Sequence, residues 1–226
     1  MWTTLLELAA QQSHWTLVGA RMVELHAREH GRTMARATVD ADALGDARIR
    51  PNPVRRLAEI LVASGFTLTE PNAFGEAHTF HRNDVEIDVL APERLGARHP
   101  GATTTIPPAH TVQVPGGRQA LARSELAMIE VGAAHGEIPR PNLVGAILLK
   151  ARAVEAGRPA VHRGDLALLL SLVSEPERLA ASLSRSEERW IRRRDDMSDP
   201  DADCWVGMTR TQRVQGIAAL RILSGE

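Results

Sequence analysis

The chain has 226 residues and a mass of 24.6 kDa, with 43% apolar and 24% charged residues, which is typical of a globular protein and excludes a disordered or fibrous one. No run of about 18 apolar residues occurs, so we expect no membrane span. The N-terminal residues lack a signal-peptide pattern, so we expect a cytoplasmic protein. The net charge of −1 excludes a global basic field for nucleic acid. The single cysteine, Cys204, excludes an internal disulfide and a cysteine-built metal site.

The first ninety residues alternate between the hydrophobic periods of helices and of strands. Glycines at 19, 31 and 65 mark the ends of several of these segments. The pattern predicts a small mixed sheet with helices, from helices at 5–12, 20–30 and 53–64 and strands at 15–18, 37–44, 66–69, 77–81 and 85–90.

The rest of the chain changes character twice. Residues 92–117 are rich in proline, glycine and threonine and predict an irregular loop, and residues 119–131 predict a strand pair or one bent strand. Helical periodicity then continues to the end, with helices expected at 142–156, 165–174, 176–183, 185–195 and 209–223. We therefore expect an α+β protein with an α/β core over 1–98, a loop and strand excursion over 99–138, and an α-helical C-terminal domain over 139–226.

Two aspartates share one face of the predicted strand at 37–44. Because alternate residues of a strand point to the same side, Thr38, Asp40 and Asp42 lie together. Aspartate is a poor strand former and the two charges repel each other, so a divalent cation such as Mg²⁺ is a natural counter-charge. The alternative is a solvated face of an edge strand, where acids prevent unwanted pairing.

A third acid and a glycine turn complete this pattern. Asp88 lies in the apolar strand at 85–90, on the face that it shares with Glu86, and a two-metal site would need such an acid. Gly19 stands where a strand passes into a helix, and such a turn lets backbone N–H groups approach a phosphate. Asp88 alone is more typical of a solvated strand face, and the glycine alone of any strand-to-helix turn.

Taken together, these residues resemble the DNA-polymerase-β-like nucleotidyltransferase superfamily, and within it the AbiEii/AbiGii-type toxin nucleotidyltransferases, including the MenT-type tRNA nucleotidyltransferases. The resemblance covers roughly residues 15–175. It rests on Gly19-Ala20, Arg36-x-Thr38-x-Asp40-x-Asp42, Ile87-Asp88-Val89-Leu90, Lys150 and Arg163-Gly164-Asp165-Leu166. The chain departs from the family pattern at Ala20, where glycine or serine is usual, and at His162 and Arg163, where lysines are usual.

The resemblance implies an enzyme that moves a nucleoside monophosphate from an NTP to an acceptor hydroxyl, with Mg²⁺ or alternatively Mn²⁺ held by Asp40, Asp42 and Asp88. The acceptor would be a tRNA 3′ end, and the protein would be a toxin neutralised by a cognate antitoxin. The implied catalytic residues are Asp40, Asp42, Asp88, Lys150 and Asp165, and the implied nucleotide-binding residues are Gly19, Ala20, Arg36, Thr38 and Lys150. The alternatives are a small-molecule or protein acceptor, or a non-catalytic module that binds a nucleotide or a partner.

Lys150 is the one lysine among 27 basic residues. It follows Leu143 and Ile147 at helical spacing, so it emerges from an apolar stripe. It either extends its ammonium to water or contacts the triphosphate. Asp165 precedes an apolar run, where it either caps a helix or enters the cleft to pair with Lys150 or position the acceptor hydroxyl.

A basic run near the C-terminus contains Arg189, Arg192, Arg193 and Arg194 beside Trp190. Such a run is typical of a solvated helix face, and the alternative is an RNA-backbone contact with a stacking aromatic.

Overall fold

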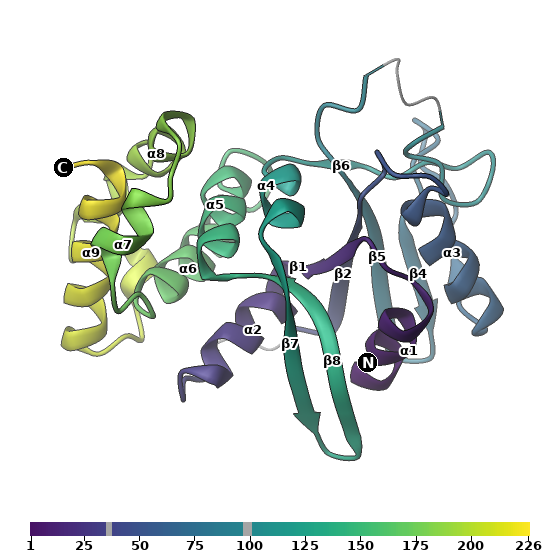
Figure 1. Ribbon diagram of the computed structural model, residues 1–226, viewed down its shortest axis with the longest axis horizontal. Coiled ribbons are helices and arrows are strands. Elements are labelled where there is room, and N and C mark those ends of the chain that lie inside the picture. Colours follow the sequence, from purple (N-terminus) through teal and green to yellow (C-terminus); the bar gives the residue numbers. More distant parts are fainter. Residues whose placement is uncertain (35–37, 97–100) are drawn as a thin grey trace. The chain divides into compact units, whose positions relative to one another are not determined.

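The structure is a computed structural model that describes residues 1–34, 38–96 and 101–226 (Figure 1). It is an α+β protein with a mixed sheet, as the sequence predicts. The first half of the chain contains α1 (Trp2–Gln11), β1 (Trp15–Val18), α2 (Gly19–Glu29), β2 (Asp40–Gly45), α3 (Pro53–Ala63), β3 (Thr67–Leu68), β4 (Thr79–Arg82), β5 (Val85–Pro92) and β6 (Gln113–Val114). The second half contains α4 (Gly117–Ala122), β7 (Ser124–Val131), β8 (Ala134–Pro141), α5 (Leu143–Ala153), α6 (Pro159–Leu170), α7 (Pro176–Ala181), α8 (Arg185–Arg192), the 3₁₀ helices η1 (Asp195–Ser198) and η2 (Asp203–Trp205), and α9 (Arg210–Ser224).

The contacts divide the chain into two compact units. The first consists of Met1–Met22 and Thr38–Asn142, and the second of Val23–Ala37 and Leu143–Glu226. Helix α2 therefore begins in the first unit and ends in the second.

The sheet of the first unit has the strand order β1-β2-β5-β4-β3 in the described part of the chain, with β6 joined to the end of β5. Strands β2 and β5 are parallel neighbours at its centre. Strand β1 pairs with β2, and β4 with β5, in antiparallel orientation, whereas the short β6 is parallel to β5. This arrangement places two acid-bearing strands side by side in the interior of the sheet.

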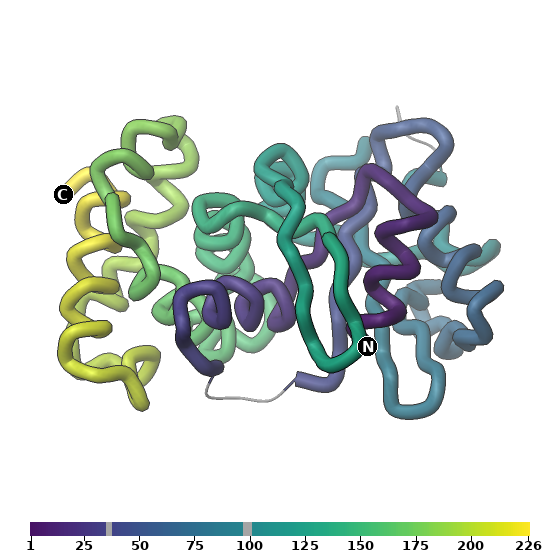
Figure 2. The backbone as a smooth tube through the Cα atoms, turned by 60° about the horizontal axis from the view of Figure 1, so that its bottom comes forward, coloured from purple at the N-terminus to yellow at the C-terminus, as the bar shows by residue number. Residues whose placement is uncertain are grey.

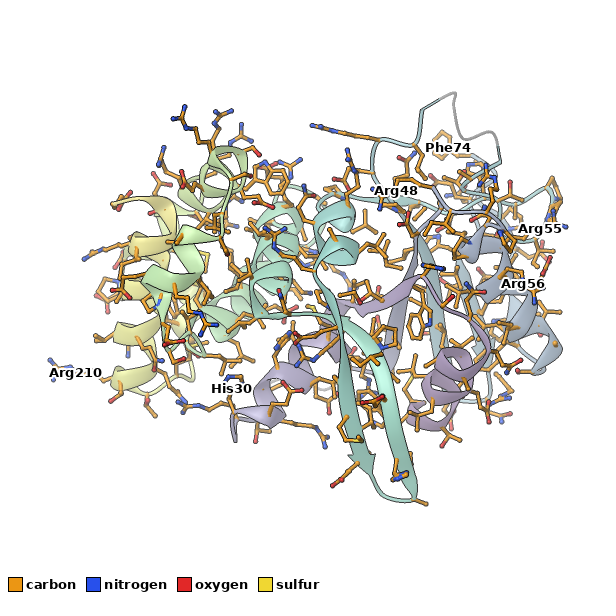
Figure 3. All side chains as sticks on the ribbon, viewed as in Figure 1. His30, Arg48, Arg55, Arg56, Phe74 and Arg210 are labelled. Carbon is orange, nitrogen blue, oxygen red and sulfur yellow. The ribbon has the colours of Figure 1, made fainter. Side chains whose placement is uncertain are left out.

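Across strands β1 to β5, one face of this sheet is apolar except for Arg82 at the end of β4. Its residues include Leu17, Ala43, Ile87 and Val89, all of which are completely buried. Helix α3 packs on β2 and β5 through its own buried residues. Its exposed side carries arginines at 55 and 56, labelled in Figure 3, which both pair with Glu59. The amphipathic pattern at 53–64 thus corresponds to a helix with one side on the sheet and one in solvent.

The prediction of strand for residues 119–131 is wrong for residues 119–122 and right for residues 124–131. Residues Gly117–Ala122 form the short helix α4, and only from Ser124 does the chain form β7, whose partner β8 follows a two-residue turn at 132–133. Gly132 has φ +60°, a conformation that glycine adopts at little cost and that the first position of a tight type II′ turn requires. Figure 2 shows this hairpin as one long loop of the tube, and its strand β8 packs on α1 and β1.

The second unit is helical apart from its connecting segments, as the periodicity predicts for most of residues 139–226. Helix α5 is buried from Gly145 to Ala151. Trp205 is the largest of the fully buried side chains, and its indole N–H donates to the Met197 carbonyl at 2.9 Å. A Cβ on Gly216 of α9 would lie 2.6 Å from that ring, so only glycine leaves room for the indole there. In the described part of the chain, no helix is long and apolar enough to span a membrane.

Candidate functional site: an acidic face of the sheet

The face of the sheet opposite the apolar one carries the predicted acids. Strands β2 and β5 pair so that Asp42 stands directly beside Asp88, and Asp40 directly beside Glu86. Residues paired in register share a face, so all four carboxylates lie on one side of the sheet. The next strand, β4, adds Thr79 beside Asp88. Acids from two segments that are distant in the sequence are thus brought side by side at the level of the backbone.

The edge-strand alternative is wrong for these acids. Strand β2 is an interior strand, paired with β1 on one side and β5 on the other. Asp40, Asp42 and Asp88 are each partly buried, whereas their neighbours Ala41 and Ala43 point to the buried face and are completely buried. The acids therefore do not serve to prevent pairing at a free edge, because both edges of β2 are already paired.

Gly19 lies against one of these carboxylates. Strand β1 ends at Val18, which pairs with Asp42, and the chain then turns into α2 with φ +68° at Gly19. A Cβ at this position would lie 1.7 Å from Asp42 Oδ2. Both the positive φ and this approach require glycine, because any side chain would displace the carboxylate. The predicted turn and the predicted acid therefore belong to one local structure.

The other carboxylate of β2 is held by residues before the strand. The Thr38 hydroxyl donates to Asp40 Oδ1, and the Thr38 carbonyl accepts a hydrogen bond of 2.6 Å from Arg21 Nη2 in the first turn of α2. The Arg21 guanidinium lies 5.5 Å above the Trp2 ring, at cation–π distance. A chain of contacts therefore connects α1 and α2 to Asp40.

Ala20 and Arg36 are the two other predicted nucleotide-binding residues next to this turn and strand. Ala20 is 7% exposed in the first turn of α2, so the position at which the family has glycine or serine is nearly buried here. Arg36 lies outside the described residues.

The donor set on the acidic face suits a hard divalent cation. Carboxylate and hydroxyl oxygens are typical ligands of Mg²⁺ and Mn²⁺, whereas zinc sites are typically built from histidines and cysteines. Among the described residues, however, no three histidine, cysteine, aspartate or glutamate side chains stand in positions that could hold a metal ion. The backbone register thus aligns Asp40, Asp42 and Asp88, while their carboxylates do not converge as a ligand group.

Glu86 is a further acid on this face that is not among the predicted metal-binding residues. It stands beside Asp40 in the register, and on its other side it pairs with His81 of β4. Both side chains are exposed. The signal was present in the alternation of residues 85–90, which puts Glu86 and Asp88 on one face.

Lys150 and Asp165 form a buried ion pair within the second unit. Lys150 Nζ lies 2.7 Å from Asp165 Oδ2, and the two side chains are 4% and 5% exposed. The pairing expected between them is therefore present, and the idea that the ammonium reaches water is wrong. The capping alternative for Asp165 is also wrong, because α6 begins at Pro159 instead of the expected 165 and Asp165 lies inside it.

A cavity of about 600 Å³ lies beside this pair in the second unit. Asp165 and Leu168 of α6 contribute to its wall, and so does the ion pair between Arg163 Nε and Asp196 Oδ2, which are 2.7 Å apart. Its size is within the range of small-molecule sites, and its lining mixes apolar side chains with charges of both signs.

The basic run near the C-terminus is largely engaged in contacts within the second unit. Arg192 donates twice to the Ser224 carbonyl at the end of α9, at 2.9 and 2.7 Å, and Arg193 and Arg194 both pair with Glu155. These contacts favour a structural role for the run over an RNA contact.

Comparison with known proteins adds no relative to this geometry: no family model matches the chain, and no curated protein is significantly similar to it.

Proposed function

We propose that this protein is a metal-dependent nucleotidyltransferase that moves a nucleoside monophosphate from an NTP to an acceptor hydroxyl. The observation that carries the proposal is the register of β2 and β5, which pairs Asp42 with Asp88 and puts Asp40 on the same face. Gly19 supports it, because the strand-to-helix turn reaches the Asp42 carboxylate directly. Acids on neighbouring parallel strands next to a helix N-terminus would combine a cation site with a phosphate site.

Asp40, Asp42 and Asp88 would hold the Mg²⁺. When bound, the cation neutralises phosphate charge and lowers the pKa of a hydroxyl that it contacts. The backbone N–H groups at the start of α2 would bind phosphate oxygens with the help of the helix dipole. Asp88 would accept the proton of the acceptor hydroxyl as that oxygen attacks the α-phosphate and pyrophosphate leaves. Thr38 would keep the Asp40 carboxylate oriented, so most of the protein's contribution is positioning.

Lys150 and Asp165 would act through the second unit. Each neutralises the other in a nearly water-free setting, which favours a role in fixing α5 against α6 over direct contact of the lysine with triphosphate. We propose a tRNA 3′ end as the acceptor and a toxin role neutralised by an antitoxin, on the basis of the motif resemblance alone.

The test is transfer of label from each α-³²P-labelled NTP, with Mg²⁺, to total tRNA or to a protein lysate. We expect label on tRNA with the natural chain and background label with Asp42→Asn or Asp88→Asn. Asp84→Asn is the matched control, because Asp84 is an exposed acid in the turn between β4 and β5, next to the same sheet. It should transfer label like the natural chain.

Binding of Mn²⁺, followed by its electron paramagnetic resonance, provides a second readout that does not depend on turnover. The free Mn²⁺ signal should decrease with the natural chain and with Asp84→Asn, and decrease much less with Asp42→Asn. Full transfer by an Asp42→Asn/Asp88→Asn double variant would refute the proposed chemistry. Label on protein alone would keep the chemistry and exclude the tRNA acceptor.

A second candidate function is a non-catalytic nucleotide-binding module. It is favoured by the absence, among the described side chains, of three metal-type ligands placed to hold an ion. The same experiments separate the two functions, because such a module would bind NTP equally well with and without Mg²⁺ and would transfer no label to any acceptor.

A further inference from the structure

The outer edge of strand β7 has no partner in the described parts of the chain. In this range β7 pairs with β8 only, over all eight of its residues, and no backbone hydrogen bond from another segment reaches its second edge. In Figure 1 the turn end of the hairpin projects past the strands of the larger sheet. A long regular strand with a free edge is a template for another strand, and most proteins protect such edges with proline, lysine or a bulge. β7 contains neither proline nor lysine, and its pairing with β8 is continuous.

The exposed side of β7 carries two large apolar side chains between Ser124 and Glu130. Leu126 and Met128 are two residues apart and therefore share a face, and they are 63% and 57% exposed. Ala127 and Ile129, on the other face, are buried. Exposed large apolar side chains next to an unpaired edge are typical of an interaction surface.

The backbone phase of the hairpin fixes which residues can form a new ladder. The Val131–Ala134 pair closes a two-residue loop, and such a loop is closed by a hydrogen-bonded pair. Alternation along the strand then directs the N–H and C=O groups of residues 125, 127, 129 and 131 toward β8. Those of residues 124, 126, 128 and 130 point to the free edge. The residues with outward backbone groups thus include Leu126 and Met128.

We propose that β7 is a dimer interface, on which a second copy of this chain adds its own β7 in antiparallel orientation, with Ala127 on the two-fold axis. In this register Leu126 faces Met128 of the second copy, and the reverse pair is identical by symmetry. Glu130 faces Ser124 and Glu125 faces Ile129, so neither acid faces an acid. The hydrogen-bonded pairs are those with outward backbone groups, and the result is a continuous four-stranded sheet. In this single register no acid faces an acid, large apolar side chains face each other, and the outward backbone groups are in phase, which favours a second copy over an unrelated strand.

The test measures mass by light scattering during size-exclusion chromatography across low to high micromolar concentrations. We expect the natural chain to reach about twice 24.6 kDa as concentration rises. The variant Leu126→Lys/Met128→Lys puts lysine opposite lysine and should weaken dimerisation at least tenfold. The variant Leu126→Lys/Met128→Glu puts lysine opposite glutamate in both symmetric pairs and should retain the dimer. Both substituted side chains, Leu126 and Met128, are exposed, so both variants should give the natural circular dichroism spectrum.

The matched control is Val206→Lys/Val214→Lys, which removes two exposed apolar side chains outside the hairpin, 77% and 60% exposed. It should dimerise like the natural chain. A natural chain that remains monomeric at every concentration would overturn the proposal and leave β7 to another protein or to solvent. Equal dimerisation of the lysine–lysine variant, or loss of the dimer in the lysine–glutamate variant or in the control, would also overturn it.

Discussion

The buried ion pair between Lys150 and Asp165 makes a sharp prediction about stability. Both charges are more than nine-tenths buried and their charged atoms lie 2.7 Å apart. Removing one partner deprives the other of the opposite charge that lies 2.7 Å away, and breaking a buried pair in this way typically costs about 3–5 kcal/mol. We therefore expect Lys150→Met and Asp165→Asn each to lower the free energy of unfolding by about 3–5 kcal/mol. In a chain of this size that loss lowers Tm by about 6–20 °C.

The double variant Lys150→Met/Asp165→Asn should be more stable than either single variant. It contains no uncompensated charge, and replacement of a whole buried pair by neutral groups is often close to neutral. Urea unfolding followed by tryptophan fluorescence measures all three variants, and a double-mutant cycle gives the coupling energy.

The surface pair between Arg163 and Asp196 provides the control. Its side chains are 33% and 46% exposed, so Asp196→Ala should cost at most about 1 kcal/mol. Losses below about 1 kcal/mol for both Lys150→Met and Asp165→Asn would refute the reasoning, because they would mean that water reaches the pair. A double variant as unstable as the sum of the single variants would refute the assignment of the cost to an unpaired charge.

Two further predictions concern Gly19 and Cys204. Gly19→Ala should lower the free energy of unfolding by about 1–2 kcal/mol because of its left-handed backbone. It should also weaken Mn²⁺ binding, because its Cβ would overlap Asp42 Oδ2. The control Gly31→Ala, at φ +64° with nothing within 4 Å of the added Cβ, should show only the backbone cost. Equal Mn²⁺ affinity of the two variants would contradict the contact. Burial raises the pKa of the Cys204 thiol to about 11. At pH 8 iodoacetamide should therefore alkylate the folded chain about a hundredfold more slowly than the urea-unfolded chain. The alkylation rate of the folded chain should rise with pH up to about pH 11. Equal rates at pH 8, measured by mass spectrometry on this single cysteine, would show that its partial burial does not raise the pKa of the thiol.

The faces of the acid-bearing strands could be predicted because a strand alternates with a period of two. This period alone puts Asp40 with Asp42 and Glu86 with Asp88, whatever the strands pair with. The change from strand to helix at Gly19 could also be predicted, since glycine at such a turn is a local signal. These features depend on neighbouring residues in the chain, which a sequence displays directly.

Strand pairing is harder to predict from the sequence than strand faces, because pairing depends on residues that are distant in the chain. No local signal in β2 specifies that Asp42, and not Asp40, stands beside Asp88. The helix α4 is only six residues long, so its residues gave no helical period that could separate them from β7. The start of α6 does have a local signal, because proline is favoured in the first turn of a helix and Pro159 stands there. The capping interpretation of Asp165 depends on a helix start at 165 instead.

The residues around the acids of β2 show that their positions are specified. Gly19 is explained by its contact with Asp42, since a side chain there would occupy the place of the carboxylate. Thr38 donates to Asp40, and Arg21 holds the Thr38 carbonyl from the first turn of α2. A solvated face would need none of these three residue types, because exposed aspartates are satisfied by water. The acidic face is thus supported by contacts from α2 and from the segment before β2, and such supported polar groups on a rigid sheet are expected where a ligand must be held.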